Sequence, residues 1–265
     1  MRLIFPSHGT IPTPERLVLR GGRRTRVPLA IRYGVLLREG HGPVLVDAGW
    51  PEPRAGDSRP LCLYRRALGA RLRPERHPLA VLRDLSHGPG DVEAIALTHL
   101  HADHVGALRD FPDAPIHAPL EALRRATRGG LGVLRHGVFA ELLPADALAR
   151  ATDVGGEEVE LPHGLGRGRD VLGDGSMVSV DLPGHADGHT GYLFPRFDPP
   201  VLFAADAQWV LAALRENRPP RGPARLVYSD RAAVEPTVRR VRRFERGGGR
   251  VVLAHDPEPV PDFAA

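Results

Sequence analysis

The most informative segment of the chain is Thr98-His99-Leu100-His101-Ala102-Asp103-His104. It follows Val92 to Leu97, a run whose length, apolar character and β-branched content predict a buried strand. Imidazole and carboxylate groups are the ligand types that Zn²⁺ and similar borderline cations accept. In an extended segment His99 and His101 point to the same side, whereas the Asp-His pair after them turns away as the chain bends into a helix. The segment therefore predicts ligands for two neighbouring cations.

Three further predicted strands end in side chains that can bind a metal. The strands and the residues that follow them are Met177 to Pro183 with His185, Val201 to Ala205 with Asp206, and Arg250 to Ala254 with His255. Binding crevices form at the carboxyl ends of strands in α/β sheets, so these groups are expected to meet there. A single histidine in a loop is usually an ordinary polar residue. The 98–104 segment, together with a metal-binding residue at the end of three other predicted strands, favours a metal site instead.

Short apolar runs alternate with helical patterns, which predicts one α/β domain over residues 1–265. Strands are expected at 31–37, 44–46, 92–97, 177–182, 201–204 and 250–253, and helices at 78–86, 103–109, 119–128 and 234–246. The Gly-rich stretch 129–169 is interpreted as a connection that contains one or two helices, of which 140–150 is the better supported. Its role stays open, because long connections can also act as functional lids.

Composition and charge argue against nucleic-acid-binding, membrane-spanning and disulfide-stabilised proteins. All 36 basic residues are Arg, the formal charge is only +4, and acidic residues are interleaved with the basic ones, so no nucleic-acid partner is expected. No stretch approaches the roughly 18 apolar residues of a membrane span, so no membrane partner is expected either. Cys62 is the only cysteine, which rules out an intramolecular disulfide. A soluble, cytoplasmic protein is the expectation.

The pattern His99-x-His101-x-Asp103-His104 resembles the signature of the metallo-β-lactamase superfamily. Pro183-Gly184-His185, Asp206 and His255 stand where later ligands of that family stand, and Val46 to Gly49 resembles its early Asp-containing turn. The resemblance extends from about residue 30 to residue 256. It implies an αββα sandwich of two facing mixed β-sheets flanked by helices, with the active site at one rim.

The resemblance also implies two divalent cations, with zinc expected and iron, manganese or cobalt as alternatives. By this resemblance, the first cation would be bound by His99, His101 and His185, and the second by Asp103, His104 and His255. Asp206 would bridge the two cations. Asp103 and Asp206 are the expected catalytic residues. In the implied mechanism a hydroxide shared by the cations attacks a lactone or ester, and Asp103 passes a proton to the leaving alkoxide.

Within the superfamily the chain is most similar to N-acyl-homoserine lactone lactonases, through Gly42 to Gly49 and the ending Ala254-His255-Asp256. Two features differ. Trp209 stands where those lactonases often carry Tyr, and the longer gap between His104 and His185 is more typical of the methyl parathion hydrolase branch. Asp206 disfavours antibiotic hydrolysis, because true β-lactamases commonly have Cys or His there.

Three interpretations therefore remain: a lactone or ester hydrolase, which could act on an acyl-homoserine lactone, a phosphoester or organophosphate hydrolase, and an inactive binding protein of the same fold. The expected partner is a small-molecule substrate, and the chain could be a monomer or a homodimer. Several residues near the predicted site could be functional or merely structural: Asp47, Trp50, Tyr64, Phe139, His189 and Trp209.

Overall fold

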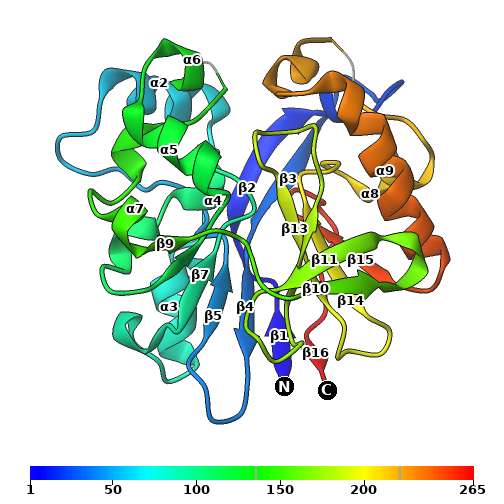
Figure 1. Ribbon diagram of the computed structural model, residues 1–265. Helices are drawn as coiled ribbons and strands as arrows, with labels where there is room; N and C mark the ends of the chain where they lie inside the picture. Colours follow the sequence, from blue (N-terminus) through cyan, green and yellow to red (C-terminus); the bar gives the residue numbers. More distant parts are fainter. Residues whose placement is uncertain (135, 221) are drawn as a thin grey trace.

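Two β-sheets lie face to face in the computed structural model, with helices on both outer sides (Figure 1). The structure describes residues 1–134, 136–220 and 222–265, so one position of the predicted connection 129–169 lies outside the described residues. Helices α2, α5, α6 and α7 cover one side, and α8 and α9 cover the other. This arrangement confirms the expected αββα sandwich.

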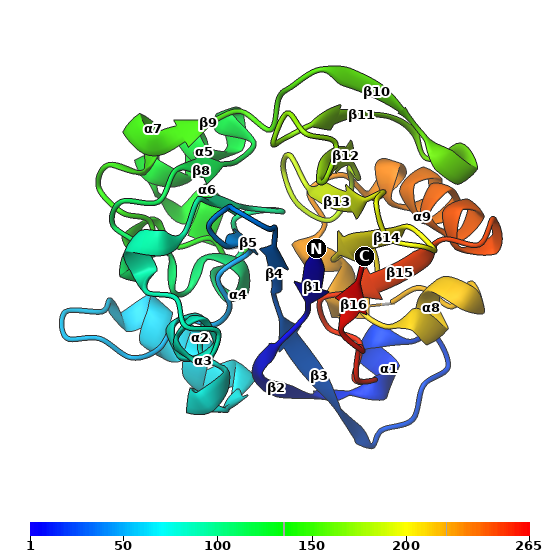
Figure 2. The same ribbon diagram turned by 90° about the horizontal axis from the view of Figure 1, so that it is seen from below.

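The first sheet has seven strands in the order β16-β1-β4-β5-β7-β8-β9. They span Phe263–Ala264 (β16), Arg2–Ile4 (β1), Gly34–Leu37 (β4), Val44–Val46 (β5), Ala94–Ala96 (β7), Ile116–His117 (β8) and Ala151–Thr152 (β9). The pairs from β5 to β9 are parallel and the others antiparallel, so the sheet is mixed. Pairing of β1 with β16 brings the two chain ends together, as Figure 2 shows.

The second sheet has six strands in sequence order, β10 to β15. They span Glu158–Leu161, Gly166–Asp170, Val178–Asp181, Thr190–Phe194, Val201–Ala205 and Arg250–Leu253. Only β14 and β15 pair in parallel. A third, small sheet joins β3 (Arg26–Arg32), β2 (Ser7–Pro14) and β6 (Arg71–Leu72).

The α-helices are mostly short. They span Glu15–Val18 (α1), Arg59–Leu68 (α2), Pro78–Asp84 (α3), Ala102–Val105 (α4), Leu120–Arg128 (α5), Leu131–Leu134 (α6), Ala147–Arg150 (α7), Leu211–Arg215 (α8) and Arg231–Arg246 (α9). Short segments of 3-10 helix complete the described part: Pro74–Arg76, Pro89–Asp91, Leu108–Asp110, Ala140–Leu142, Pro162–Gly164 and Gly222–Val227. No helix within the described ranges combines the length and the apolar character needed to cross a membrane.

Apolar packing follows the layers. Phe5 and Val46 of the first half meet Phe203 and Val252 of the second in the core between the two sheets. A second core fills the space between the first sheet and helices α2, α3 and α5, and a third lies between the second sheet and α9. Removing these surfaces from water stabilises the sandwich by roughly 25 cal/mol per Å² of apolar area.

Three predicted elements differ from the structure. The helix expected at 140–150 is wrong: a 3-10 turn, Ala140–Leu142, and α7 are separated at Pro144, which cannot continue a helix. The helix expected at 103–109 ends with α4 at Val105, because Gly106 packs against the loop that follows β5. The strand expected at 31–37 is divided at Tyr33 between β3 and β4, which belong to different sheets.

Candidate metal centre

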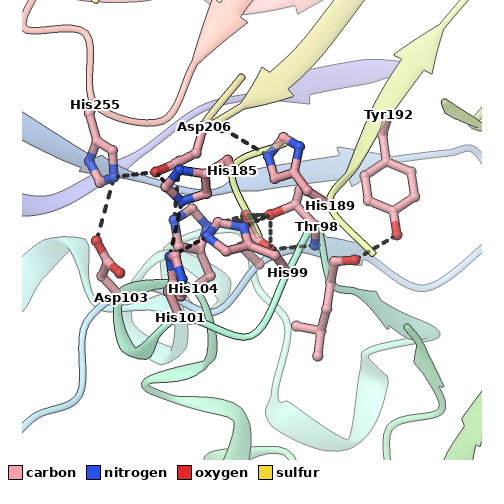
Figure 3. Close-up of polar contacts among 12 residues, drawn as sticks. Thr98, His99, His101, Asp103, His104, His185, His189, Tyr192, Asp206 and His255 are labelled. Carbon is pink, nitrogen blue, oxygen red and sulfur yellow. Dashed lines mark hydrogen bonds and ion pairs between the residues drawn. The ribbon is translucent and has the colours of Figure 1, made fainter. Parts of the chain in front are cut away.

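Residues from both large sheets meet in one buried cluster (Figure 3). The segment after β7 supplies His99 and His101, and α4 begins directly after them. His101 keeps extended backbone angles (φ −63°, ψ 152°) as the residue that caps this helix. The change from strand to helix therefore occurs between the first two histidines and the Asp103-His104 pair, as the sequence predicts.

The first group consists of three imidazoles. Nδ1 of His101 lies 3.0 Å from Nε2 of His99 and 3.0 Å from Nε2 of His185. With Zn–N bonds of about 2.0–2.1 Å, nitrogen ligands of one tetrahedral ion lie roughly 3.3 Å apart. The three nitrogens are thus spaced as ligands of a single cation, and all three side chains are buried.

The second group adds carboxylates. Nε2 of His255 lies 3.5 Å from Oδ2 of Asp103 and 3.1 Å from Oδ2 of Asp206. Asp206 also lies 3.3 Å from Nε2 of His104 through Oδ1 and 3.3 Å from Nε2 of His185 through Oδ2. Its carboxylate therefore lies between the two groups, where a bridging ligand would have to be.

Three atoms in this cluster have their hydrogen-bonding capacity unused: Nε2 of His104, Nδ1 of His185 and Oδ1 of Asp206. All three are fully buried, and none makes a hydrogen bond of acceptable geometry within the described part of the chain. A buried polar atom without a partner costs about 1–3 kcal/mol, so native proteins rarely leave one. A cation between Nε2 of His104 and Oδ1 of Asp206, which lie 3.3 Å apart, would satisfy both atoms, so the donor set fits a metal.

The outer nitrogens of three histidines show which tautomer each imidazole adopts. Nδ1 of His104 donates to Oδ2 of Asp47 over 2.7 Å, and Nδ1 of His255 donates to the Ala30 carbonyl over 2.7 Å. Nδ1 of His99 lies 3.0 Å from Oγ1 of Thr98. Because each Nδ1 carries the hydrogen, each Nε2 has a free lone pair directed into the cluster. Metal-binding histidines are typically held in this way.

Asp47 is both a turn residue and an acceptor for the site. It adopts a positive φ of 65° directly after β5. Its Oδ1 accepts hydrogen bonds from the backbone and hydroxyl of Thr98, over 2.8 and 3.0 Å. A carboxylate only accepts, so the Thr98 hydroxyl donates to it and is left to accept from His99. Asp47 thus orients His104 directly and His99 through Thr98.

His189 is not placed to be an eighth ligand. Its Nδ1 donates to the Leu182 carbonyl over 2.7 Å, and its Nε2 accepts from the backbone N–H of Asp206 over 3.2 Å. Both nitrogens are therefore committed to the backbone, and the ring fixes the position of Asp206. Trp209 also contacts that residue, because its Nε1 donates to Oδ2 of Asp206 over 3.0 Å.

Electrostatics divide the histidines into two sets. Burial lowers the pKa of His99 and His185 well below the usual range, and lowers the pKa of His101 to about 4. These three imidazoles are neutral at neutral pH, as metal ligands must be. The first group therefore offers three lone pairs without competition from protons.

His104 and His255 behave in the opposite way. Burial alone would lower both pKa values, but nearby carboxylates outweigh it: Asp47 and Asp206 raise the pKa of His104, and Asp206 and Asp103 raise that of His255. Burial would raise the pKa of Asp206, yet the surrounding imidazoles, His255 foremost, hold it well below its usual range. The negative charge of the second group thus attracts either protons or a cation.

Residues 30–254 match the family model described as Metallo-beta-lactamase superfamily, which covers most of the chain. The chain belongs to the metallo-beta-lactamase superfamily. Its buried cluster occupies the carboxyl ends of the strands on which the sequence resemblance to this superfamily rests.

Relatives within the superfamily include lactonases. N-acyl homoserine lactonase AttM of Azorhizobium caulinodans is 29% identical over 204 residues, which cover 72% of this chain and 68% of that protein. An N-acyl homoserine lactone hydrolase with the product N-hexanoyl-L-homoserine at its catalytic metal centre superposes with a TM-score of 0.70 at 19% identity, over 98% of both chains. AidC, a dizinc quorum-quenching lactonase, superposes with a TM-score of 0.66 at 13% identity, over 97% of this chain and 88% of that one.

A cavity of about 360 Å³ opens beside the cluster. Its polar floor includes Asp103, Asp206 and His255, and Trp209 lines one wall. The remaining wall is largely apolar and comes from several elements: Ile11, Leu17, Leu29, Tyr64, Leu68, Leu134 and Val227. Sequence reasoning missed the contribution of β2, α1 and β3, because these segments precede the metal-binding motifs and carry no ligand.

Of Trp50, Tyr64 and Phe139, which the sequence left as either functional or structural, Tyr64 alone lines this cavity. Trp50 and Phe139 are buried against its ring, as packing would predict. The segment 129–169 contributes Leu134 and Gly137 to the same cavity, so part of it does reach the site.

A second cluster with metal-binding side chains consists of His8, Glu52 and His77, which no pattern in the sequence connects. Here the tautomers are reversed. Nδ1 of His8 accepts from the backbone N–H of Trp50 over 3.2 Å, and Nδ1 of His77 accepts from that of Leu79 over 3.2 Å. Each Nε2 must then carry the hydrogen and cannot bind a cation, so this cluster is a hydrogen-bonded one.

Proposed function

We propose that the protein is a binuclear metal-dependent hydrolase that cleaves lactones or esters, including N-acyl-homoserine lactones. The observation that carries the proposal is the position of Asp206 between two groups of ligands. His99, His101 and His185 would hold one cation, and Asp103, His104 and His255 would hold the other. Zinc is the proposed metal, because nitrogen and carboxylate donors in four-coordinate groups suit it.

Two bound cations would supply Lewis acidity, which polarises a carbonyl and lowers the pKa of water from 15.7 toward about 7. The chain's own residues then have distinct tasks. Asp206 would be the ligand shared by both cations, and His189 fixes the backbone of Asp206. Asp103, at the edge of the cavity, is the proposed carrier of a proton to the leaving oxygen.

The cavity supports a substrate with an apolar part. Apolar side chains such as Leu29 and Leu68 line the same cavity as Asp103, Asp206 and His255, so an acyl chain could contact the former while a carbonyl lies beside the candidate metal centre. The names of the lactonase relatives point to the same substrate class. An inactive binding protein is disfavoured, because all seven predicted ligands are present and gathered.

The proposal is tested by metal analysis and a substrate panel. The purified protein should contain about two metal ions per chain and should hydrolyse acyl-homoserine lactones or aryl esters, with activity lost to a chelator and restored by Zn²⁺. Phosphotriesters belong in the panel, since preferential cleavage of them would favour the organophosphate alternative. A chain without metal, unaffected by chelator, would overturn the proposal.

Asp206→Ala provides the matched variant. Loss of the bridge should abolish turnover and reduce the metal content to one ion per chain or fewer. Glu121→Gln, on the exposed surface of α5, is the control and should match the parent protein. Full metal content and full turnover in Asp206→Ala would show that the assigned bridge is wrong.

A further inference from the structure

The phenol groups of the chain differ in what they bind. Of four tyrosines, Tyr33 donates its hydroxyl to the Arg76 carbonyl and Tyr192 donates to the Leu97 carbonyl, each over 3.0 Å. The hydroxyls of Tyr64 and Tyr228 form no hydrogen bond with any residue that the structure describes. These two hydroxyls are free to bind something else.

Only one of the two tyrosines lines the cavity. Tyr64 lines it together with Asp103, Asp206 and His255, although it lies on α2, far from them in sequence. Tyr228 is not part of the cavity wall, although its ring lies 6.1 Å from that of His185. The two tyrosines therefore form a natural pair for comparison.

The ring of Tyr64 is held firmly. It stacks on Trp50, with ring centroids 5.6 Å apart and planes at 21°, and contacts the edge of Phe139 at 5.1 Å. Ser58 caps α2 and is anchored to Glu141 through its backbone N–H and its hydroxyl. A side chain fixed in this way loses little entropy when a ligand binds.

The Tyr64 hydroxyl can donate a hydrogen bond to a ligand in the cavity. Burial raises its pKa well above the usual range, so the phenol keeps its proton at neutral pH. The indole N–H of Trp209, which also lines the cavity, is already committed to Asp206. The phenol of Tyr64 is thus an uncommitted, uncharged donor beside the candidate metal centre.

We propose that the Tyr64 hydroxyl donates a hydrogen bond to the carbonyl oxygen of the substrate, a role that rests on the proposed lactone or ester hydrolysis. In that reaction water adds to the carbonyl carbon, the bond to the alkoxy oxygen breaks, and a carboxylate, an alcohol and a proton result. The phenol gives up no proton. Its hydrogen bond strengthens as the carbonyl oxygen gains negative charge, so it stabilises the transition state more than the bound substrate.

Tyr64→Phe tests the proposal because it removes one oxygen and keeps the stacked ring. We expect kcat for the hydrolysed lactone or ester to fall by about 100-fold, the order of magnitude seen when a single oxyanion donor is removed. KM should change by less than about threefold, because the lost bond is stronger in the transition state than in the bound substrate. Metal content and unfolding temperature should not change. Tyr228→Phe, which removes the other free hydroxyl, should retain the parent kcat.

A binding measurement gives a second readout that needs no turnover. N-hexanoyl-L-homoserine, titrated calorimetrically into the zinc-loaded protein, should bind about tenfold more weakly to Tyr64→Phe than to Tyr228→Phe, the loss expected for one hydrogen bond to a charged oxygen. Parent activity and parent affinity in Tyr64→Phe would overturn this role while leaving the hydrolase proposal intact. A parent protein that hydrolyses nothing in the panel would instead overturn the proposed function itself.

Discussion

At the scale of single residues, the position of one hydrogen on each imidazole separates the two histidine clusters. In the candidate metal centre the outer nitrogens of His99, His104 and His255 donate to oxygen atoms, which leaves the inner lone pairs free. In the His8 cluster the corresponding nitrogens accept from backbone N–H groups. Proximity of imidazoles is therefore not sufficient for a metal site. Each outer nitrogen must also have an acceptor, so that the inner nitrogen keeps a lone pair for the metal.

Asp47→Asn tests whether an acceptor that fixes the histidine tautomers is needed for metal binding, because Asp47 orients two of the proposed ligands. The substitution keeps the shape of the side chain, but the new amide cannot accept from both Thr98 and His104, so the His104 tautomer is no longer fixed. Loss of such an acceptor typically lowers metal affinity by about 10–100-fold. Competition with a chromophoric chelator measures the affinity of each site, and Asp91→Asn, exposed at a distant turn, is the control. Unchanged affinity would contradict the assigned role.

At the scale of elements, the short helix α4 is positioned by its contact with the loop after β5. The backbone N–H groups of Gly106 and Ala107 donate to the carbonyls of Gly49 and Ala48, over 2.9 and 3.0 Å. A Cβ added to Gly106 would lie 2.1 Å from the Trp50 carbonyl carbon. The absence of a side chain there allows the helix that carries Asp103 and His104 to approach this loop.

Gly106→Ala should therefore destabilise the fold and disturb the candidate metal centre together. Backbone atoms must move to accept the methyl group, and overpacking of this kind costs about 1–3 kcal/mol. Urea unfolding of the metal-free protein measures the loss, and metal content after reloading reports on the second cation. Gly90→Ala, where a Cβ would meet only open space, should unfold within about 0.5 kcal/mol of the parent protein. Equal stability of the two variants would contradict this account.

The sequence predicted best those strands that are largely buried. Strands β7, β12, β14 and β15 are short, mostly buried runs that precede the metal-binding residues, and each lies where its pattern indicates. The hairpin of β10 and β11 was missed because its strands are partly exposed, and Gly166–Asp170 is built of Gly, Arg and Asp. Its strand character comes from pairing between neighbours, which periodicity does not reveal.

Helix α2 shows a different limit of prediction. Its signals are local, with Ser58 as the cap and Gly69 in the left-handed region after its last turn, and Leu61 is its one buried residue. That Tyr64 reaches the candidate site follows from packing of α2 against distant segments, not from any motif. The ligands, by contrast, were predictable, because the strand ends that carry them meet at one edge of the fold.

At the scale of the whole molecule, the candidate site joins the two halves of the sandwich. His99 to His104 follow the first sheet, whereas His185, Asp206 and His255 follow strands of the second. Bound cations would therefore tie the two sheets together. Without them, the carboxylates of the second group draw protons to His104 and His255. Protons and cations thus compete for the same buried negative charge.

This competition predicts that the stabilisation of the fold by metal increases as pH rises. A histidine whose pKa is raised in the folded, metal-free protein stabilises that state fully below about pH 6.5, its unfolded value, and the contribution disappears as pH rises through the raised pKa. Chelator should lower the unfolding temperature more at pH 8 than at pH 6, because the protons on His104 and His255 stabilise the metal-free protein less at the higher pH. A metal ion present at 100 times its Kd stabilises the folded protein by about 2.7 kcal/mol per site, which sets the size of the effect.

Calorimetric unfolding scans with Zn²⁺ or with chelator, at pH 6 and at pH 8, measure the effect. Mg²⁺, which prefers oxygen ligands, is the control. A shift that is equal or smaller at pH 8 would contradict the competition.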